Sequence, residues 1–368
     1  MISHLILNQF YGKNGNPLGF GETLIQNDLA ESFQMVATQG PDAFYRGSLG
    51  EAIHSSMELS QGFLSIRDLE SDKAEWWEPV SIDFGEYKVY TASPPSTAFP
   101  SLIRLGLMEQ INYEHNTAEY LQMFAEATKY AFWSRLAFAG DPEINPPPLE
   151  KLLSKKYLDS VRETFSMTAA KRFNYPGTES ESKNTTHFVV ADSWGNIVSA
   201  TQTLGNLFGS RIMPEGTGIW LNNSLAYCTY EPKGNPMDAI PGQRKLSGDC
   251  PTIILKNQKP WAALGSPGGH TIGQNVPQIV LNLIKFNMTI KEAIAAPKIT
   301  FVEPDWMYIE SGISENVYQD LGSRGQNVRR IKRIGNAHGL RVYYNDNGEI
   351  DRYEGSADPR GGGLAEGY

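Results

Sequence analysis

A hairpin pattern in the middle of the chain constrains the fold most strongly. Two apolar runs, His187–Asp192 and Asn196–Thr203, are joined by a short S-W-G turn. Such runs on either side of a turn are typical of paired antiparallel strands. The preceding segment, Thr178–Lys183, has no apolar side chain, which predicts an exposed loop. Thr185 is therefore expected where a solvated loop enters a buried strand.

Thr185 is a candidate nucleophile because of this position. A chain cut before it would give Thr185 a free α-amino group beside its own hydroxyl. In such a pair the hydroxyl attacks while the N-terminal amine takes its proton. An α-amine titrates near ~7.7–8 when unperturbed and lower when buried, so it can act as a base near neutral pH. The alternative interpretation is that the threonines simply open a strand, since threonine favours strands.

The composition indicates a globular protein and excludes several functional classes. The 368 residues are 40% hydrophobic and 20% charged, which is ordinary for a globular chain of one large or two smaller domains. The net charge of -9 argues against a nucleic-acid surface, and no apolar run reaches the ~18 residues of a membrane span. The first ten residues lack the basic segment of a secretory signal. We therefore expect a cytoplasmic protein, with a periplasmic or secreted location open if further N-terminal residues exist.

The cysteines and histidines predict neither a disulfide scaffold nor a metal site. Cys228 and Cys250 are too few for such a scaffold and lack metal-ligand spacing. Two structural thiols are expected, with one disulfide as the alternative. The six histidines form no H-E-x-x-H motif or similar cluster, so no metal is expected.

Apolar spacing, caps and stop signals predict mainly helices in the first half of the chain. The predicted strand Tyr87–Thr91 lies between them, and the polar stretch Met167–Asn184 is predicted to be a mobile linker. The predicted helices are Asn27–Gln39, a segment that begins at Pro41, a short helix capped by Ser65, Phe99–Ile111, Thr117–Phe138 and Ser154–Phe165.

Hairpins dominate the second half. Two further hairpins are predicted, one from Thr252–Lys256 and Trp261–Gly265, and one from His338–Asn345 and Glu349–Ser356. A helix that Pro277 helps to start is expected to end at Phe286, and a capping box at Thr289–Glu292 begins another. Helices and antiparallel hairpins in blocks predict an α+β protein in which helices cover sheets.

A glycine-rich turn follows the second predicted hairpin and is another candidate for chemistry. Residues 265–270 read G-S-P-G-G-H, which matches no phosphate-binding loop. Leu264 stands where a nucleophile elbow has its first glycine, so that motif is absent too. A strand–Gly-Gly–helix turn can point backbone N–H groups into a cleft as an oxyanion hole. The alternative is a tight turn without a catalytic role.

Several motifs occur in a characteristic order from Thr185 onward. They are T-T-H-F-x-x-x-D-x-x-G-N-x-V-S, F-G-S, G-I-x-L-N-N at 218–223, L-S-x-x-x-P-T-I at 246–253 and G-S-P-G-G at 265–269. This order is similar to that of γ-glutamyltransferases, a family of N-terminal-nucleophile hydrolases. Residues 21–24 and 40–47 resemble the family's large subunit, and residues 357–368 resemble its C-terminus. The resemblance covers nearly the whole chain.

The resemblance implies a four-layer αββα sandwich of α+β class and self-cleavage between Asn184 and Thr185. Residues 1–184 would be the C-terminal part of the large subunit and residues 185–368 the small subunit, which together form one structural domain. Thr185 would form an acyl-enzyme from a small-molecule amide or γ-glutamyl substrate and pass the acyl group to water or an amine. No cofactor, nucleic acid or membrane is implied, and a homo-oligomer is compatible with the family.

The resemblance also implies roles for other residues. Thr203 matches the residue that orients the nucleophile, Gly268 and Gly269 match the oxyanion hole, and Ser247 matches a hydroxyl that holds the substrate's α-carboxylate.

The sequence departs from the family pattern around the substrate. Gly248 replaces a second carboxylate-binding hydroxyl. The ligands of the glutamyl ammonium group fall on Gly205, Ser224 and Tyr227, which carry no charge. Hydrogen bonds to charged groups are worth ~1.5–3 kcal/mol each. We therefore expect a preference for glutaryl-type acyl groups, which lack the ammonium, unless Asp249 substitutes for the lost carboxylate.

Two parts of the family pattern are missing. The segment from Tyr227 to Lys245 is too short for a lid loop, as in acylases of the cephalosporin type. A substantial N-terminal portion is absent as well, with its substrate-binding arginine. One alternative is therefore an inactive or partner-dependent fragment, and another is a serine hydrolase that uses Ser266 with His187 or His270.

Overall fold

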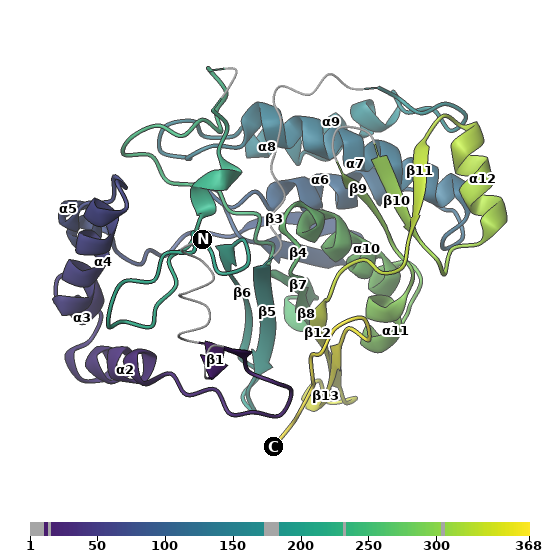
Figure 1. Cartoon of the computed structure of the whole chain (residues 1–368). Coiled ribbons are helices and arrows are strands. Elements are labelled where there is room, and N and C mark those ends of the chain that lie inside the picture. The colour runs from purple at the N-terminus through teal and green to yellow at the C-terminus, as the bar shows by residue number, and fades with distance from the viewer. Residues whose placement is uncertain (1–10, 14–15, 173–183, 231–232, 303–305) are drawn as a thin grey trace. The chain divides into compact units, whose positions relative to one another are not determined.

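The computed structural model describes residues 11–13, 16–172, 184–230, 233–302 and 306–368 (Figure 1). The predicted linker lies mostly outside these residues. The chain divides into two compact units, residues 1–76 with 206–223 and residues 77–205 with 224–368. The predicted cleavage position therefore falls within the second unit, to which both predicted subunits contribute.

The first unit consists of helices and one short hairpin. The predicted capping box is confirmed, because Ser65 Oγ accepts from the Asp68 N–H while the Asp68 carboxylate accepts from the Ser65 N–H. The 206–223 segment is held to the helices by a 2.7 Å hydrogen bond from the Ser32 hydroxyl to the Thr217 carbonyl. The elements are β1 (Gly12–Lys13), β2 (Asn16–Pro17), α2 (Asn27–Gln39), α3 (Asp42–Tyr45), α4 (Ser48–Leu59) and α5 (Ile66–Ser71).

A six-stranded antiparallel sheet forms the centre of the second unit. Its order is β13-β12-β8-β7-β4-β3. Asn257 and Gln258 turn the β7–β8 hairpin with positive φ angles, as a two-residue hairpin turn requires. The strands are β3 (Val80–Phe84), β4 (Tyr87–Thr91), β7 (Thr252–Lys256), β8 (Lys259–Gly265), β12 (His338–Tyr344) and β13 (Ile350–Ala357).

Helices cover one face of this sheet (Figure 1). Every residue of α6 is buried, and its apolar side chains share a core with α7, α10 and the sheet. The helices of this unit include α6 (Phe99–Met108), α7 (Ala118–Phe138), α8 (Leu149–Leu152), α9 (Lys155–Arg162), α10 (Ile272–Ile284) and α11 (Ile290–Ala295).

Pro277 lies inside α10 rather than at its start, so this prediction was wrong. A proline cannot donate to the carbonyl four residues earlier, which would leave a buried acceptor unpaired. Here that carbonyl, on Gly273, accepts from Arg104 Nη1 at 3.0 Å and from Ser101 Oγ at 3.1 Å. The side chains of α6 thus allow α10 to continue through the proline.

The central hairpin packs on the opposite face of the sheet. β5 (Asn184–Ala191) and β6 (Ile197–Gly205) pair antiparallel. Their inward side chains, including Val189 and Ile197, belong to an apolar cluster with Ala263 of β8 and Leu340 of β12. Helices, a six-stranded sheet and a two-stranded sheet thus form three consecutive layers, and the predicted α+β sandwich is confirmed.

A smaller sheet of order β11-β10-β9 completes the unit. β10 (Trp306–Glu310) and β11 (Asn327–Ile331) are parallel and connect through α12 (Glu315–Ser323), while β9 (Ile299–Val302) is antiparallel to β10. This sheet, whose strands have four or five residues each, was not predicted from the sequence. Within the described ranges, no helix has the length and apolar character needed to cross a membrane.

Candidate active site

The hairpin places Thr185 and Thr203 opposite each other. The Thr185 hydroxyl donates to the Thr203 hydroxyl at an oxygen–oxygen distance of 3.0 Å. The Gly205 N–H donates to the same Thr203 oxygen at 2.8 Å. The structure therefore brings together the predicted nucleophile and the residue predicted to orient it.

The strand pairing is irregular at the predicted cleavage position. Asn184 pairs with Gly205, but Thr185 pairs with Thr203, so Leu204 is an extra residue on β6, as in a β-bulge. Gly205 has a φ of 87°, in the left-handed region that favours glycine. Gly205 therefore shapes the backbone beside Asn184, a function that the sequence analysis did not anticipate.

His187 connects the start of β5 to the end of β8. Its Nδ1 lies 2.8 Å from Thr201 Oγ1, and its ring lies so close to Gly265 that a Cβ there would come within 2.3 Å of it. Burial, with a smaller contribution from the charge of His338, lowers the pKa of His187 to about 4. The imidazole is therefore neutral at neutral pH. Its packing brings the glycine-rich turn after β8 to the same end of the sandwich as Thr185.

Thr271 fixes the glycine-rich turn. Its N–H and its hydroxyl both donate to the Gly268 carbonyl, at 3.1 and 2.8 Å. The N–H of a trans peptide points opposite to its carbonyl, so this anchor turns the Gly269 N–H away from Thr271. Gly268 has a φ of 135° and Gly269 a φ of 57°. Thr271 was not predicted from the sequence, in which its only signal is a hydroxyl three residues after Gly268.

Residues 247–249 run beside this turn. Thr97 donates its N–H to the Ser247 carbonyl at 2.7 Å, which holds the segment to the loop after β4. A Cβ on Gly248 would lie 3.4 Å from the Gly269 carbonyl oxygen and 3.7 Å from the Tyr227 ring. Gly248, Gly269 and Tyr227 are therefore neighbours, as the predicted substrate site requires.

Asp249 binds the hydroxyl of Ser247. Ser247 Oγ donates to Asp249 Oδ2 at 2.6 Å. Burial raises the pKa of Asp249, while the Ser247 hydroxyl and the positive charge of Lys245 oppose that rise. Burial lowers the pKa of Lys245, and the charge of Asp249 opposes that change. Ser247 is thus bonded to a carboxylate whose charge Lys245 partly compensates, and of these two charged residues only Asp249 was predicted from the sequence.

Ser224 and Tyr227 are the two ends of a short 3-10 helix, η1 (Ser224–Tyr227). Both side chains are buried. Tyr227 reaches Gly248, so it lies in the candidate site. Ser224 lies at the other end of the same turn. Both contribute neutral groups.

The alternative serine nucleophile has a different geometry. Ser266 is fully buried, and its hydroxyl donates to the Pro267 carbonyl at 2.8 Å. His187 directs its Nδ1 to Thr201 instead, and the side chain of His270 lies outside the described residues. Cys228 and Cys250 are free thiols, so the disulfide alternative was wrong.

Comparisons with known proteins agree on one family. The Gamma-glutamyltranspeptidase family model matches residues 3–368. The glutathione hydrolase proenzyme of Escherichia coli (strain K12) is 34% identical over 368 residues, covering 95% of this chain and 63% of that protein. The Acylase ACY 1 proenzyme of Pseudomonas sp. (strain V22) is 33% identical over 361 residues, covering 95% of this chain and 64% of that protein.

A solved structure shows the same fold. The crystal structure of cephalosporin acylase from Bacillus halodurans matches with a TM-score of 0.88 at 24% identity, covering 100% of this chain and 67% of that one. The chain thus spans slightly less than two thirds of the length of the two curated relatives.

Proposed function

This chain belongs to the gamma-glutamyltranspeptidase family of N-terminal-nucleophile hydrolases, and we propose that it cleaves itself before Thr185 and then uses Thr185 to transfer acyl groups from amides. The observation that carries the proposal is the 3.0 Å hydrogen bond from Thr185 to Thr203, beside the bulge at Asn184. A hydroxyl held in one direction at the start of a strand is suited to attack a neighbouring carbonyl. The relatives that are glutathione hydrolase and acylase proenzymes support the same reaction class.

Self-cleavage starts from the intact peptide bond. Thr185 Oγ1 attacks the carbonyl carbon of Asn184, the C–N bond breaks, and the hydroxyl proton passes to the released amine. An ester now links Asn184 to the Thr185 side chain. Water hydrolyses this ester, which leaves a carboxylate on Asn184 and a free α-amino group on Thr185.

Turnover uses the new α-amine as the base. The amine takes the Thr185 hydroxyl proton as Oγ1 attacks the amide carbon of the substrate, and the proton then passes to the leaving amine. Water or an acceptor amine cleaves the resulting ester. The Gly268–Gly269 turn supplies N–H donors for the negative oxygen, and a single such donor is worth ~2.7–4 kcal/mol in other enzymes.

The charges beside Ser247 favour a glutaryl-type acyl group over a γ-glutamyl group. A substrate carboxylate accepts from the Ser247 hydroxyl when that hydroxyl turns from Asp249 to the substrate, and the positive charge of Lys245 near Asp249 favours this exchange. An ammonium group meets only neutral groups of Ser224 and Tyr227, because Asp249 is already bonded to Ser247 and its charge is offset by Lys245. A cation without a counter-charge in a partly desolvated site costs several kcal/mol.

A denaturing gel of the purified chain tests the proposal. Two fragments of nearly equal length are expected, since 184 residues precede Thr185 and 184 begin with it. Edman sequencing of one fragment should read T-T-H-F-V-V. Thr185→Ala should leave a single chain without amidase activity. Thr186→Ala is the matched control, because Thr186 is exposed and pairs with Gln202 on the outer face. An uncut wild-type chain with full amidase activity would refute the mechanism.

A further inference from the structure

Two histidine rings lie between the hairpin and the six-stranded sheet, and each has a buried nitrogen without a hydrogen-bond partner among the described residues. These atoms are His187 Nε2 and His338 Nδ1. His187 is only 3% exposed, and its other nitrogen lies 2.8 Å from Thr201 Oγ1. A buried polar atom is costly unless it is bonded. The two nitrogens therefore mark a place where a further hydrogen-bonding group is expected.

Strand geometry brings these two rings together. His338 of β12 faces the hairpin, because side chains alternate along a strand and Leu340 belongs to the cluster that the hairpin covers. His338 is paired with Gly265 of β8, and such paired positions have Cβ atoms about 4.5–5.5 Å apart. The His187 ring takes the place of a Gly265 side chain, since a Cβ there would lie 2.3–2.6 Å from its atoms. The two imidazoles are therefore neighbours.

Water is the molecule that suits this pair. Burial lowers the pKa of both rings, and the charge of His338 lowers that of His187 further, so both rings are neutral at neutral pH. Asp358 opposes the change at His338, but its carboxylate already accepts from Arg360, and Thr201 carries no charge. Each nitrogen of a neutral imidazole either donates or accepts one hydrogen bond. Water does both, so it can bridge the rings in every combination of tautomers.

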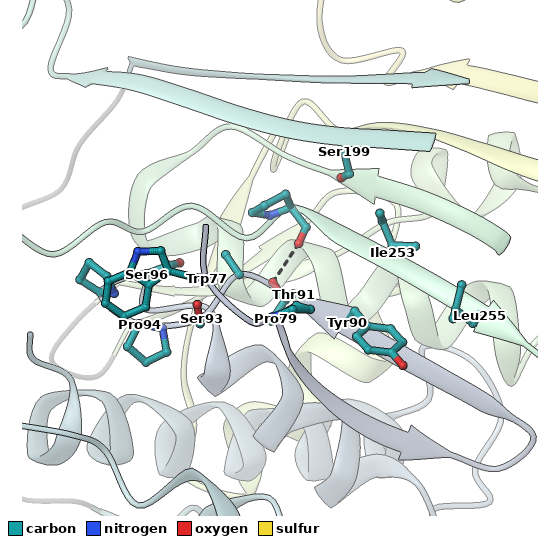
Figure 2. A pocket seen from close by; sticks show the side chains of 13 residues that line it. Trp77, Pro79, Tyr90, Thr91, Ser93, Pro94, Ser96, Ser199, Ile253 and Leu255 are labelled. Atoms are coloured by element: carbon teal, nitrogen blue, oxygen red, sulfur yellow. Dashed lines mark hydrogen bonds between the residues drawn. The ribbon is translucent and has the colours of Figure 1, made fainter. Parts of the chain in front are cut away.

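Water can enter the space between these layers from the side of β6. A groove of about 610 Å³ is lined there by Ser199 of β6 and by Ile253 and Leu255 of β7, which Figure 2 shows below Ser199. Ser199 faces the six-stranded sheet, because its hydroxyl donates to the Leu264 carbonyl at 3.3 Å. Thr201 is the next residue of β6 that faces the same way. The groove therefore ends one side chain away from the partner of His187.

We propose that one buried water bridges His187 Nε2 and His338 Nδ1, and that His338 acts through this bridge as a positioning residue for acyl transfer. The bridge holds the His187 ring against Gly265, where β8 passes into the glycine-rich turn. Because Thr185 begins the strand that carries His187, the bridge sets the distance between Thr185 and the N–H donors of the turn. The inference rests on the proposed function, which gives that distance its importance.

A high-resolution crystal structure and histidine NMR test the bridge itself. We expect one ordered water within about 2.7–3.2 Å of both nitrogens. Because the charge of His338 lowers the pKa of His187, His338→Gln should move the titration midpoint of His187 to higher pH. His115→Gln is the matched control and should leave that midpoint unchanged. Burial lowers the pKa of His115 too, but its ring packs against Tyr120 and Phe286.

Steady-state kinetics at neutral pH test the positioning role. His338→Leu removes both polar atoms of the ring and should lower kcat at least about fivefold with little change in KM, because the N–H donors of the turn act on charge that develops in the transition state. His338→Gln can still bond the water and should keep kcat within about twofold of the wild type. Thermal unfolding checks each fold, and His338→Met replaces the leucine variant if that variant unfolds.

Four results would overturn the inference. They are a structure in which no water lies between the two nitrogens, an unchanged His187 midpoint in His338→Gln, an unchanged kcat in His338→Leu, and an equal loss of kcat in His338→Leu and His338→Gln. A wild-type chain that neither cleaves nor turns over would count against the proposed function. The ordered water and the titration of His187, which need no catalysis, would then decide the inference.

Discussion

The Thr185 hydroxyl donates to the Thr203 hydroxyl across the hairpin, and the Gly205 N–H holds the same acceptor from the other side. Thr203→Val keeps the shape of the side chain and removes this acceptor. We expect cleavage and kcat each to fall at least tenfold, equivalent to about 1.4 kcal/mol, with little change in KM. Timed gels and steady-state kinetics measure the two rates, with Gln202→Ala as control. Unchanged rates for Thr203→Val would show that its hydroxyl does not position Thr185.

Ser266→Ala separates the two candidate nucleophiles. Its hydroxyl bonds to the Pro267 carbonyl, so its loss should leave cleavage intact and activity within about tenfold of the wild type, far less than the loss of a nucleophile. Gel analysis and amidase assays provide the comparison. Retained activity in Thr185→Ala together with loss in Ser266→Ala would favour a serine hydrolase.

Substrate preference depends on Lys245 and Asp249. We expect a higher kcat/KM for glutaryl than for γ-glutamyl anilides at one pH, because only the γ-glutamyl group brings an ammonium without a free counter-charge. Lys245→Met should lower kcat/KM for the glutaryl anilide about tenfold, or about 1.4 kcal/mol, with a smaller effect on the γ-glutamyl anilide. A γ-glutamyl preference of about a hundredfold or more would mean that Asp249 binds the ammonium group, contrary to this prediction.

His187 should make the stability of the fold decrease as the pH falls. Its pKa is about 4 in the fold, against 6.5 for an ordinary histidine, so the unfolded chain binds the proton more readily. The neutral imidazole therefore contributes about 3 kcal/mol to the free energy of unfolding above pH 6.5. This contribution is lost as the pH falls to about 4. Denaturant unfolding of wild type and His187→Gln at pH 7 and 4 isolates this effect. An equal pH dependence in both proteins would contradict the assignment.

Local signals predicted much of the fold. α2 ends where expected because Gly40 and Pro41 stop it, and the caps at Ser65 and Thr289 start helices as predicted. The three hairpins were visible as apolar runs around short turns. By contrast, α10 continues through Pro277 because Arg104 and Ser101, far away in the sequence, satisfy the freed carbonyl. No local pattern contains that information.

The candidate site was likewise predictable in part from the sequence. The resemblance to the family pointed to Thr203, Ser247, Gly268 and Gly269, and the hairpin of the structure pairs Thr203 with Thr185. The anchor from Thr271 depends on the direction of one carbonyl. The interaction between the charges of Lys245 and Asp249 depends on how residues 245–249 fold back. The spacing of the two residues in the sequence does not specify that conformation.

Pro277 in α10 makes the effect of a substitution at position 104 depend on which residue stands at position 277. While Pro277 is present, the Gly273 carbonyl depends on donors from α6, and Arg104 supplies one of them from a buried position. With alanine at 277, the helix would regain its own donor and Arg104 would compete for a carbonyl already bonded. Residues that share a partner in this way have non-additive effects when substituted. A change at 104 is therefore expected to cost less stability after a change at 277 than before it, although Ser101 still donates to the Gly273 carbonyl in either order.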